Sequence, residues 1–186
     1  MDEALDFNKI SFVKYTQLLS PLIKESDFNC GNTDLDEFLR EELEKHREQM
    51  VTQSTLIIYE EKKIIGYFSL QTDSIRLADE ERSKFEAAGI PYKSFPSVKI
   101  GRLAVDERYA KKGLGKTILE VIIGIVRNSQ ENIASRFITV DSKKNEHALR
   151  FYRKNGFVEN LIYNKDPKRE TVSFRFDLYN PSKSKN

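Results

Sequence analysis

A run of basic and glycine residues between a predicted strand and a predicted helix carries the clearest chemical signal in the sequence. It occupies residues 105–119, where Gly113 and Gly115 would let a bulky anion approach the backbone closely. Three lysines surround the glycines: Lys111, Lys112 and Lys116. The first amides of a helix have no partner within the helix, and the helix dipole adds partial positive charge there. These residues predict a binding site for phosphate oxygens.

The flanking elements are those that an anion site at a helix start requires. Residues 97–105 predict a buried strand. After the loop, apolar residues recur at helical spacing on one face: Leu114, Ile118, Leu119, Ile122, Ile123 and Val126. A dinucleotide-binding fingerprint needs a third glycine where Ile118 stands, and no segment has the G-x-x-x-x-G-K-S/T spacing of a nucleotide-hydrolase loop. Both of those alternatives are excluded.

A second segment downstream combines polar and aromatic residues on a predicted short helix, residues 145–155. Ala148, Phe151 and Tyr152 are grouped there by helical spacing. Asn145 is typical of a helix cap, and Gly156 can adopt the positive φ that ends a helix. We interpret Phe151 as a core residue, whereas for Tyr152 a structural and a chemical role both stay open.

Together the two segments resemble the GNAT acetyltransferase superfamily. Residues 110–115 are similar to its acyl-CoA pyrophosphate loop, Q/R-x-x-G-x-G/A, and residues 145–157 are similar to its N-x-x-A-x-x-F-Y-x-x-x-G-F motif. Ala110 stands where the family has Gln or Arg, which leaves one side-chain contact to the pyrophosphate open but keeps the backbone donors. The resemblance implies acetyl-CoA as the acyl donor, held by these residues: Leu103, Ala104, Val105, Ala110, Lys111, Lys112, Gly113, Leu114, Gly115, Lys116, Thr117, Asn145, Ala148, Phe151 and Tyr152.

The resemblance also implies direct acetyl transfer to an uncharged amine. Backbone groups of Leu103 and Val105 would pair with the pantetheine arm, to which Asn145 adds a contact. The Val105 N–H would donate to the thioester oxygen as negative charge develops there, and Tyr152 would protonate the departing CoA thiolate. The expected catalytic residues are thus Tyr152 and Val105. No metal and no covalent enzyme intermediate is needed, and the base that takes the amine proton stays unassigned.

Length and composition predict one globular domain, residues 1–180, followed by a disordered tail, residues 181–186. The chain has 186 residues, and a hydrophobic content of 39% is enough to fill a sizeable core. No run approaches the roughly eighteen apolar residues of a membrane span, and the acidic start does not resemble a signal peptide. Cys30 is the only cysteine, which suits a reducing cytoplasm. No histidine lies at a spacing from Cys30 that suggests nucleophilic catalysis.

The formal net charge of +2 hides an uneven distribution along the chain. Residues 1–60 hold 6 Lys or Arg against 13 Asp or Glu, whereas residues 111–186 hold 16 against 8. Such an uneven charge distribution usually reflects charged residues on solvent-exposed helix faces. Eight basic residues in the second half exceed what one CoA requires: Lys143, Lys144, Arg150, Arg153, Lys154, Lys165, Lys168 and Arg169. They are compatible with a polyanionic acceptor such as RNA.

The order of predicted elements is that of an α/β (α+β) protein with the GNAT fold, in which helices flank a central mixed, mostly antiparallel sheet of six to seven strands. A helix is expected over 34–49, capped by Asn32 or Thr33, and a second within the 76–96 insertion, near 79–88. The insertion also carries an irregular stretch with Pro91 and Pro96. Besides the strand before the anion loop, strands are expected near 10–15, 55–59, 64–75, 136–140, 157–163 and 171–178.

Three further segments narrow the resemblance to one GNAT subgroup. Residues 28–39 are similar to its F-x-C/S-G-x-x-x-L-D-x-F/W/Y-L opening, and residues 64–70 and 100–105 to its V-G-Y-Y-x-L and L-G-R-L-A-V segments. The subgroup includes toxins of toxin–antitoxin pairs that acetylate aminoacyl-tRNA, which implies charged tRNA as acceptor and an antitoxin as partner. A protein amine or a small polyamine is the alternative acceptor, and a non-catalytic CoA-binding module the alternative of another class. A homodimer is expected from the exposed strands and the insertion.

Overall fold

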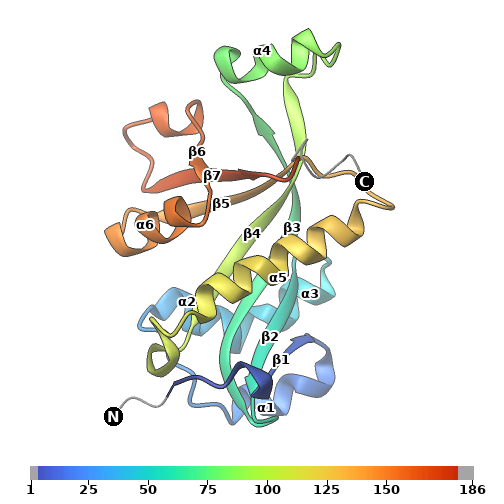
Figure 1. Ribbon diagram of the computed structural model, residues 1–186. Coiled ribbons are helices and arrows are strands. Elements are labelled where there is room, and N and C mark those ends of the chain that lie inside the picture. Colours follow the sequence, from blue (N-terminus) through green and yellow to red (C-terminus); the bar gives the residue numbers. More distant parts are fainter. Residues whose placement is uncertain (1–3, 180–186) are drawn as a thin grey trace. The chain divides into compact units, whose positions relative to one another are not determined.

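The computed structural model describes residues 4–179 (Figure 1). These residues form two compact units. Residues 4–71 and 101–119 form the first unit, and residues 72–100 and 120–179 form the second. Two strands and one helix continue from one unit into the other: β3 (Lys63–Arg76), β4 (Ser94–Val105) and α5 (Leu114–Ser129).

The first unit begins with an antiparallel meander. Strand β1 (Ile10–Lys14) pairs with β2 (Gln53–Tyr59) from Ile10↔Tyr59 to Lys14↔Thr55, and β2 pairs with β3 around the predicted polar turn. The β2–β3 register shifts between Ile57 and Ile58, which marks a bulge. The hairpin and the first strand were therefore predicted correctly from alternating apolar residues.

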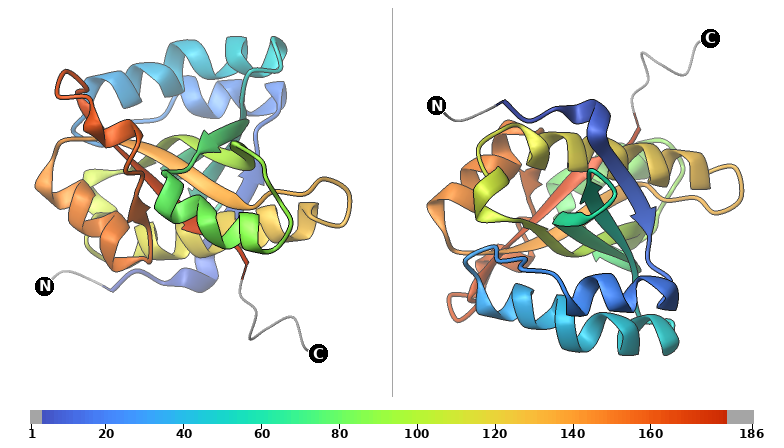
Figure 2. Two further views of the ribbon diagram at one scale, coloured as in Figure 1. Left: turned by 90° about the horizontal axis from the view of Figure 1, so that it is seen from above. Right: turned by 90° about the horizontal axis from the view of Figure 1, so that it is seen from below.

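Helices cover one face of this meander. The predicted helix over 34–49 is a continuous helical run made of α2 (Thr33–Glu37), a π-helical turn (Phe38–Glu42) and α3 (Leu43–Glu48). Asn32 occupies the N-cap position but makes no capping bond with its side chain. A short helix that the sequence did not predict, α1 (Ser20–Lys24), lies beside this run (Figure 2), with Ser20 Oγ 3.4 Å from Glu44 Oε1.

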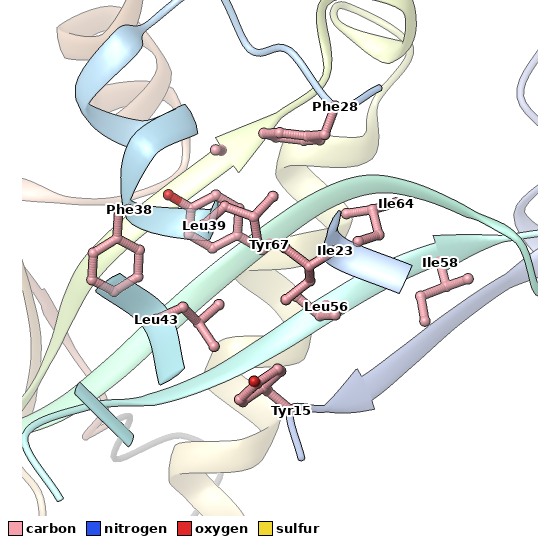
Figure 3. Packing of buried hydrophobic residues seen from close by; sticks show 11 residues of the cluster. Tyr15, Ile23, Phe28, Phe38, Leu39, Leu43, Leu56, Ile58, Ile64 and Tyr67 are labelled. Carbon is pink, nitrogen blue, oxygen red and sulfur yellow. The ribbon is translucent and has the colours of Figure 1, made fainter. Parts of the chain in front are cut away.

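The core of the first unit is built around Tyr67 on β3 (Figure 3). Its ring lies edge-on to Phe28 at 5.9 Å between centroids and stacks on Phe38 at 6.0 Å. Its buried hydroxyl donates a 2.7 Å hydrogen bond to the Leu35 carbonyl, which satisfies the polar end of the side chain. Because Phe28, Leu35 and Phe38 all come from the 28–39 segment, this core fixes that segment against β3.

The second unit contains the remaining helices and strands: α4 (Asp79–Ala87), β5 (Phe137–Lys143), α6 (Glu146–Lys154), β6 (Val158–Glu159) and β7 (Thr171–Asp177). β4 and β5 are parallel, from Ser97↔Phe137 to Ile100↔Val140, whereas β5 with β7 and β6 with β7 are antiparallel. A separate core gathers around Phe85, Phe95 and Phe137, with Phe85 and Phe95 4.3 Å apart between ring centroids.

Two expected boundaries are wrong in the second unit. Pro96 lies inside β4, which starts at Ser94, because its carbonyl accepts from the Arg136 N–H at 2.8 Å and so pairs with a distant part of the chain. The strand expected over 157–163 is only β6, followed by a 3-10 turn at Tyr163–Lys165. The buried amide of Asn160 ends it, because its nitrogen donates to Ser173 Oγ and its oxygen accepts from Arg175.

The strand order is β1-β2-β3-β4-β5-β7-β6, a mixed seven-stranded sheet with one parallel pair recorded and helices beside it. The predicted fold class is therefore confirmed. That residues 1–180 act as one domain stays a prediction, and the tail predicted at 181–186 lies outside the described residues. No helix among residues 4–179 is long and apolar enough to span a bilayer.

Candidate functional site

The loop before α5 has the backbone geometry of an anion site. Gly113 caps the helix, since its carbonyl accepts from the N–H groups of Lys116 and Thr117 at 3.0 and 3.3 Å. Lys111 and Gly113 both have positive φ, +62° and +88°. Left-handed residues that alternate with ordinary ones turn successive N–H groups toward one concavity, a nest suited to phosphate oxygens. The amides that precede Lys116 at the start of this 16-residue helix lack intrahelical acceptors.

The side chains of the loop add positive charge around that concavity. Lys111 and Lys116 are exposed, and Lys112 is half-buried with its Nζ 6.0 Å from the centre of the Tyr109 ring. Ala110 is exposed, and its N–H donates to the Glu107 carbonyl at 3.2 Å, which closes the preceding 3-10 turn, Glu107–Tyr109. The Ala110 methyl group makes no polar contact, so backbone amides and lysines are the donors that this loop offers.

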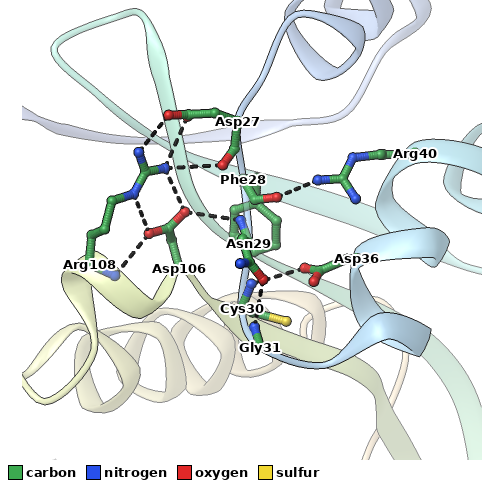
Figure 4. Close-up of polar contacts among 9 residues, drawn as sticks. All are labelled: Asp27, Phe28, Asn29, Cys30, Gly31, Asp36, Arg40, Asp106 and Arg108. Carbon is green, nitrogen blue, oxygen red and sulfur yellow. Dashed lines mark hydrogen bonds and ion pairs between the residues drawn. The ribbon is translucent and has the colours of Figure 1, made fainter.

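A buried carboxylate braces the base of the loop (Figure 4). The side chain of Asp106 is 1% exposed and accepts four hydrogen bonds: one from the Asn29 N–H at 3.1 Å, one from the Arg108 N–H at 3.0 Å, and two from the Arg108 guanidinium at 2.8 Å. Burial alone would raise the pKa of Asp106, but the bonds from Arg108 and Asn29 outweigh it and hold that pKa below its ordinary value. Asp106 therefore stays ionised and fixes the first turn after β4.

The same network reaches the 28–39 segment of the chain. The Arg108 guanidinium also pairs with exposed Asp27 at 2.5 and 3.0 Å, and the Glu107 N–H donates to the Asn29 carbonyl at 3.0 Å. Gly31 has φ +72°, and a Cβ built there would lie 2.4 Å from Glu107 Oε1, so a larger residue would displace that carboxylate. The segment over residues 28–39 thus braces the anion loop.

Further contacts hold this segment in place. Asp36 accepts from the Cys30 N–H at 3.0 Å, and Arg40 donates to the Phe28 carbonyl (Figure 4). Burial, reinforced by Asp36, raises the pKa of the Cys30 thiol to about 12. Because the thiolate is the nucleophilic form, this environment agrees with the expectation that Cys30 is not a nucleophile.

Strand β4 leads into the loop through the three residues expected to pair with an acyl carrier. Ala104 is buried, whereas Leu103 and Val105 are half-buried. The backbone is close to β3 here: the Asp106 N–H donates to the Ile65 carbonyl at 3.0 Å, and a Cβ built at Gly66 would lie 2.9 Å from the Ala104 carbonyl oxygen. Glycine at residue 66 therefore permits the close approach of the two strands at this point.

The second predicted motif forms α6 in the second unit. Asn145 caps the helix, because its Oδ1 accepts from the N–H groups of His147 and Ala148 at 2.9 and 3.3 Å, and Gly156 with φ +83° follows its end, both as predicted. Phe151, interpreted as core, is only half-buried, whereas Tyr152 is 7% exposed. Helical geometry turns Tyr152, not Phe151, toward the rings of Phe157 and Phe174, at 5.4 and 5.8 Å.

Burial raises the pKa of the Tyr152 phenol well above its ordinary value. Among residues 4–179 the structure records no hydrogen bond to the Tyr152 hydroxyl and no charged group among the causes of this shift. A phenol in such a setting stays protonated over the whole neutral range. It can give a proton only to a stronger base, such as a thiolate that forms beside it.

The predicted site residues thus fall into two groups. Leu103 to Val105 and Ala110 to Thr117 are brought together in the first unit, and Asn145, Ala148, Phe151 and Tyr152 are brought together in the second. Asp106, Arg108 and Asp27 were not predicted from the sequence. A charged residue directly after an apolar strand, followed at two residues by an opposite charge, is the signal that could have found Asp106 and Arg108. Within the described residues no cluster of three or more His, Cys, Asp or Glu could hold a metal ion.

Known proteins share this fold. Residues 19–157 match the model of the Acetyltransferase (GNAT) family. Among solved structures, a Tyr-to-Phe mutant of KacT superposes with a TM-score of 0.74 at 22% identity, over 90% of this chain and 95% of that one. AtaT complexed with acetyl-methionyl-tRNAfMet gives 0.72 at 23% identity, over 90% and 94%. A Tyr-to-Phe mutant of the AtaT toxin, bound to the C-terminus of the antitoxin AtaR and acetyl-CoA, gives 0.68 at 20% identity, over 91% and 94%.

The family model covers most of the chain, including the strand, the anion loop and α6. These are the elements that a carrier with a diphosphate and a thioester requires, and the loop geometry fits the diphosphate. The chain belongs to the GNAT acetyltransferase family and is an N-acetyltransferase that uses acetyl-CoA.

Proposed function

We propose that this enzyme acetylates the amino group of aminoacyl-tRNA, as a toxin of a toxin–antitoxin pair would. The left-handed backbone at Lys111 and Gly113, at the start of α5, is the observation that carries the binding of acetyl-CoA. The amides of residues 112–116 bind the diphosphate, and the surrounding lysines neutralise its charge. With the diphosphate bound in this way, the remaining loop residues from Ala110 to Thr117 also contact acetyl-CoA.

The end of β4 aligns the reacting end of the carrier in this proposal. Backbone groups of Leu103 and Val105 pair with the pantetheine arm, beside Ala104, and the Asn145 side chain adds a contact from the start of α6. The Val105 N–H donates to the thioester oxygen, where negative charge develops as the amine attacks. A fixed backbone donor is stabilising there because it needs no reorganisation during the reaction.

Tyr152 protonates the departing thiolate in this proposal. Burial keeps the phenol neutral, which is the form that an acid requires, and the rings of Phe151, Phe157 and Phe174 limit its movement. The amine must lose its proton before it attacks the thioester, and a water molecule can carry this proton away. Ala148 lies one turn before Tyr152 on α6 and contacts the carrier in this proposal.

Basic residues of the second unit support a nucleic-acid acceptor. Of the eight predicted, Arg153 pairs with Glu159 at 2.7 Å and Arg169 pairs with Asp141 at 2.6 Å, so these two are engaged within the protein. Five others are exposed with no ion pair recorded among residues 4–179: Lys144, Arg150, Lys154, Lys165 and Lys168. Arg150 and Lys154 lie one turn apart on α6. Such a group suits phosphates along an RNA backbone.

The similar structures suggest the same acceptor and partner. AtaT was solved with acetyl-methionyl-tRNAfMet, and its mutant with the C-terminus of an antitoxin. We therefore propose aminoacyl-tRNA as acceptor and an antitoxin protein as partner, in the cytoplasm, where acetyl-CoA and charged tRNA occur. Acetylation of a protein amine or a small polyamine is the alternative, and a homodimer stays a prediction.

Release of CoA thiol from acetyl-CoA tests the acceptor. The purified enzyme is given charged tRNA, uncharged tRNA, a peptide with a free N-terminus, and spermidine. We expect turnover with charged tRNA and none with uncharged tRNA. Turnover only with spermidine or the peptide would contradict the proposed acceptor while leaving the acetyltransferase activity intact.

A charge variant then tests the nucleic-acid surface. Replacing Arg150, Lys154 and Lys168 by Gln should lower kcat/KM for charged tRNA and reduce the slope of log kcat/KM against log salt by about 0.7–0.9 per lost phosphate contact. Lys9, Lys14 and Lys24, changed to Gln together, form a control of equal charge in the first unit. The tRNA surface is refuted if both triple variants have the same salt slope.

A further inference from the structure

The second unit contains a polar cavity of about 260 Å³ that the proposed chemistry has not used. Six polar residues that line it matter here: Asp73, Lys99, Thr139, Asp141, Arg169 and Ser173. The volume lies near the lower limit of ligand pockets, about 300 Å³, which suits a small group such as one amino-acid residue.

The cavity lies on one face of the sheet. Thr139 and Asp141 alternate on β5 with apolar residues, and Ser173 precedes Phe174 on β7. Since successive residues of a strand face opposite sides, Ser173 and Phe174 point to opposite faces. Phe174 contacts the ring of Tyr152 at 5.8 Å, so the cavity and Tyr152 lie on the two sides of the same pair of strands.

One carboxylate of the cavity is fully engaged within the protein. Asp141 pairs with Lys99 at 2.7 Å and with Arg169 at 2.6 Å. Burial acts to raise the pKa of Asp141, but these two cations outweigh it and hold that pKa below the ordinary value. Arg169 is fixed further by Thr171 Oγ1 at 3.1 Å and by the Tyr163 ring below its guanidinium, 5.6 Å from the ring centre. Asp141 is thus a structural anchor for two cations.

The other carboxylate is open toward a ligand. Asp73 is half-buried and accepts one hydrogen bond, from Thr139 Oγ1 at 2.7 Å, and no ion pair to it is recorded among residues 4–179. Thr139 is 2% exposed, so this bond fixes the carboxylate from below. A carboxylate has about four lone-pair sites, of which one is used here. Lys99 and Arg169, conversely, have more N–H groups than Asp141 and Thr171 engage.

We propose that this cavity binds the α-amino carbonyl group of the acceptor, with its ammonium group on Asp73 and its carbonyl oxygen facing Lys99 and Arg169. The assignment rests on the proposed function, in which the acceptor is an amine. A carboxylate that lacks a cation, beside two cations with spare donors, is the electrostatic complement of an amine next to a carbonyl group. A simple polyamine has no group for the cationic side, whereas an aminoacyl ester and a peptide N-terminus both do.

Binding of a small probe tests the cavity without acetyl transfer. L-methioninamide has the α-amino carbonyl group, and 4-(methylthio)butanamide is the same molecule without the amino group. In a nitrogen-15 NMR titration of the full chain, we expect saturable shifts of the amide signals of Asp73, Thr139 and Ser173 with the first probe only. Equal shifts with both probes, or no saturable shift at these residues, would overturn the proposal.

Variants then test the role of Asp73. Asp73→Asn should weaken L-methioninamide binding about tenfold or more, since a hydrogen bond to a charged group contributes about 1.5–3 kcal/mol. Glu170→Gln removes an exposed carboxylate of the same unit that does not line the cavity and should leave the affinity unchanged. Asp73→Ser serves as a second variant if Asp73→Asn loses its dispersed spectrum. An unchanged affinity in a folded Asp73 variant would refute the proposal.

The two proposals can fail separately. If L-methioninamide binds at Asp73 while charged tRNA is not acetylated, the assignment of the cavity is supported and the proposed tRNA acceptor is wrong. Turnover of a peptide with a free N-terminus would then identify a protein amine as the acceptor. If Asp73→Asn acetylates charged tRNA with unchanged kcat/KM, the acceptor stands and the cavity assignment is wrong.

Discussion

Asp106 holds Arg108 through two parallel hydrogen bonds of 2.8 Å, from Nε to Oδ1 and from Nη2 to Oδ2. The geometry is bidentate, and the carboxylate is buried whereas the guanidinium is half exposed. Asp27 holds the same guanidinium from solvent. The anion loop begins two residues after this pair, so the position of the loop depends on it.

Asp106→Asn should therefore both destabilise the protein and weaken acetyl-CoA binding. The change removes a charged acceptor of four hydrogen bonds, for which we expect a loss of about 1–3 kcal/mol in the free energy of unfolding. Urea unfolding measures that loss, and calorimetric titration measures the Kd of acetyl-CoA. Asp27→Asn is the matched control: it contacts the same arginine but is exposed, so its loss should stay below about 1 kcal/mol. Equal losses for both variants would contradict a special role of Asp106.

The contribution of Asp106 should also depend on pH. Its pKa in the folded protein lies below the unfolded value of about 3.9, so the folded state binds this proton less readily than the unfolded state does. The stability that wild type has over Asp106→Asn should be complete above about pH 5 and decrease as the pH falls through the folded pKa. Urea unfolding of both proteins at pH 7 and pH 3 measures this; a difference that stays constant would count against the ionised, buried carboxylate.

Gly113→Ala should weaken acetyl-CoA binding without a general loss of stability. An L-residue with φ near +88° is strained by about 1–2 kcal/mol, so the free loop would adopt another conformation and turn its amides away. This corresponds to an increase of about 5- to 30-fold in the Kd of acetyl-CoA. Gly89→Ala imposes the same strain at φ +77°, with no atom within 4 Å of the added methyl group, outside the loop. An equal change of Kd in both variants would show that the loop conformation is not what matters.

Tyr152→Phe should lower kcat by about 10²- to 10⁴-fold and leave the Kd of acetyl-CoA nearly unchanged. The ring and its packing stay, and only the proton donor is lost. Because burial raises the pKa of Tyr152 above its ordinary value of about 10, the kcat of wild type should show no decrease from this group as the pH rises toward 10. Tyr179→Phe, at an exposed phenol, is the control. Full activity of Tyr152→Phe would remove this residue from the role of acid.

Cys30 should be unreactive in the folded protein. With a pKa of about 12, its thiolate fraction at pH 8 is on the order of a thousandfold smaller than that of an ordinary cysteine. A disulfide reagent should label it only after unfolding, and Cys30→Ala should keep most of the activity. Rapid labelling of the native enzyme, with loss of turnover, would instead indicate a reactive thiol.

Local patterns predicted much of the fold. The apolar stripe of α5, the β2–β3 hairpin and the cap of α6 depend on neighbours within a few residues, and each was predicted correctly. The short β6 could not be predicted in this way, because Asn160 ends it through bonds to Ser173 and Arg175 on another strand. Likewise Pro96 lies in β4 because the Arg136 N–H, far along the chain, uses its carbonyl.

In the candidate site, too, local features could be predicted from the sequence and long-range contacts could not. The glycines and lysines of the anion loop act through backbone geometry and charge, which residue types reveal. The hydrogen bonds by which Asp106 holds the loop could not be predicted, because Asn29 and Asp106 are 77 residues apart in sequence. The sequence does indicate that Asp73 lies on a polar face of the sheet, because polar residues alternate along β3 at Ser69, Gln71 and Asp73. Its hydrogen bond with Thr139 could not be predicted, because that bond depends on the strand order.

A crystal structure of the enzyme with saturating acetyl-CoA tests the central claim most directly. The diphosphate oxygens should lie about 3 Å from backbone nitrogens of residues 112–116, with the thioester oxygen facing the Val105 N–H. A diphosphate bound anywhere else, with these amides facing solvent, would contradict the account.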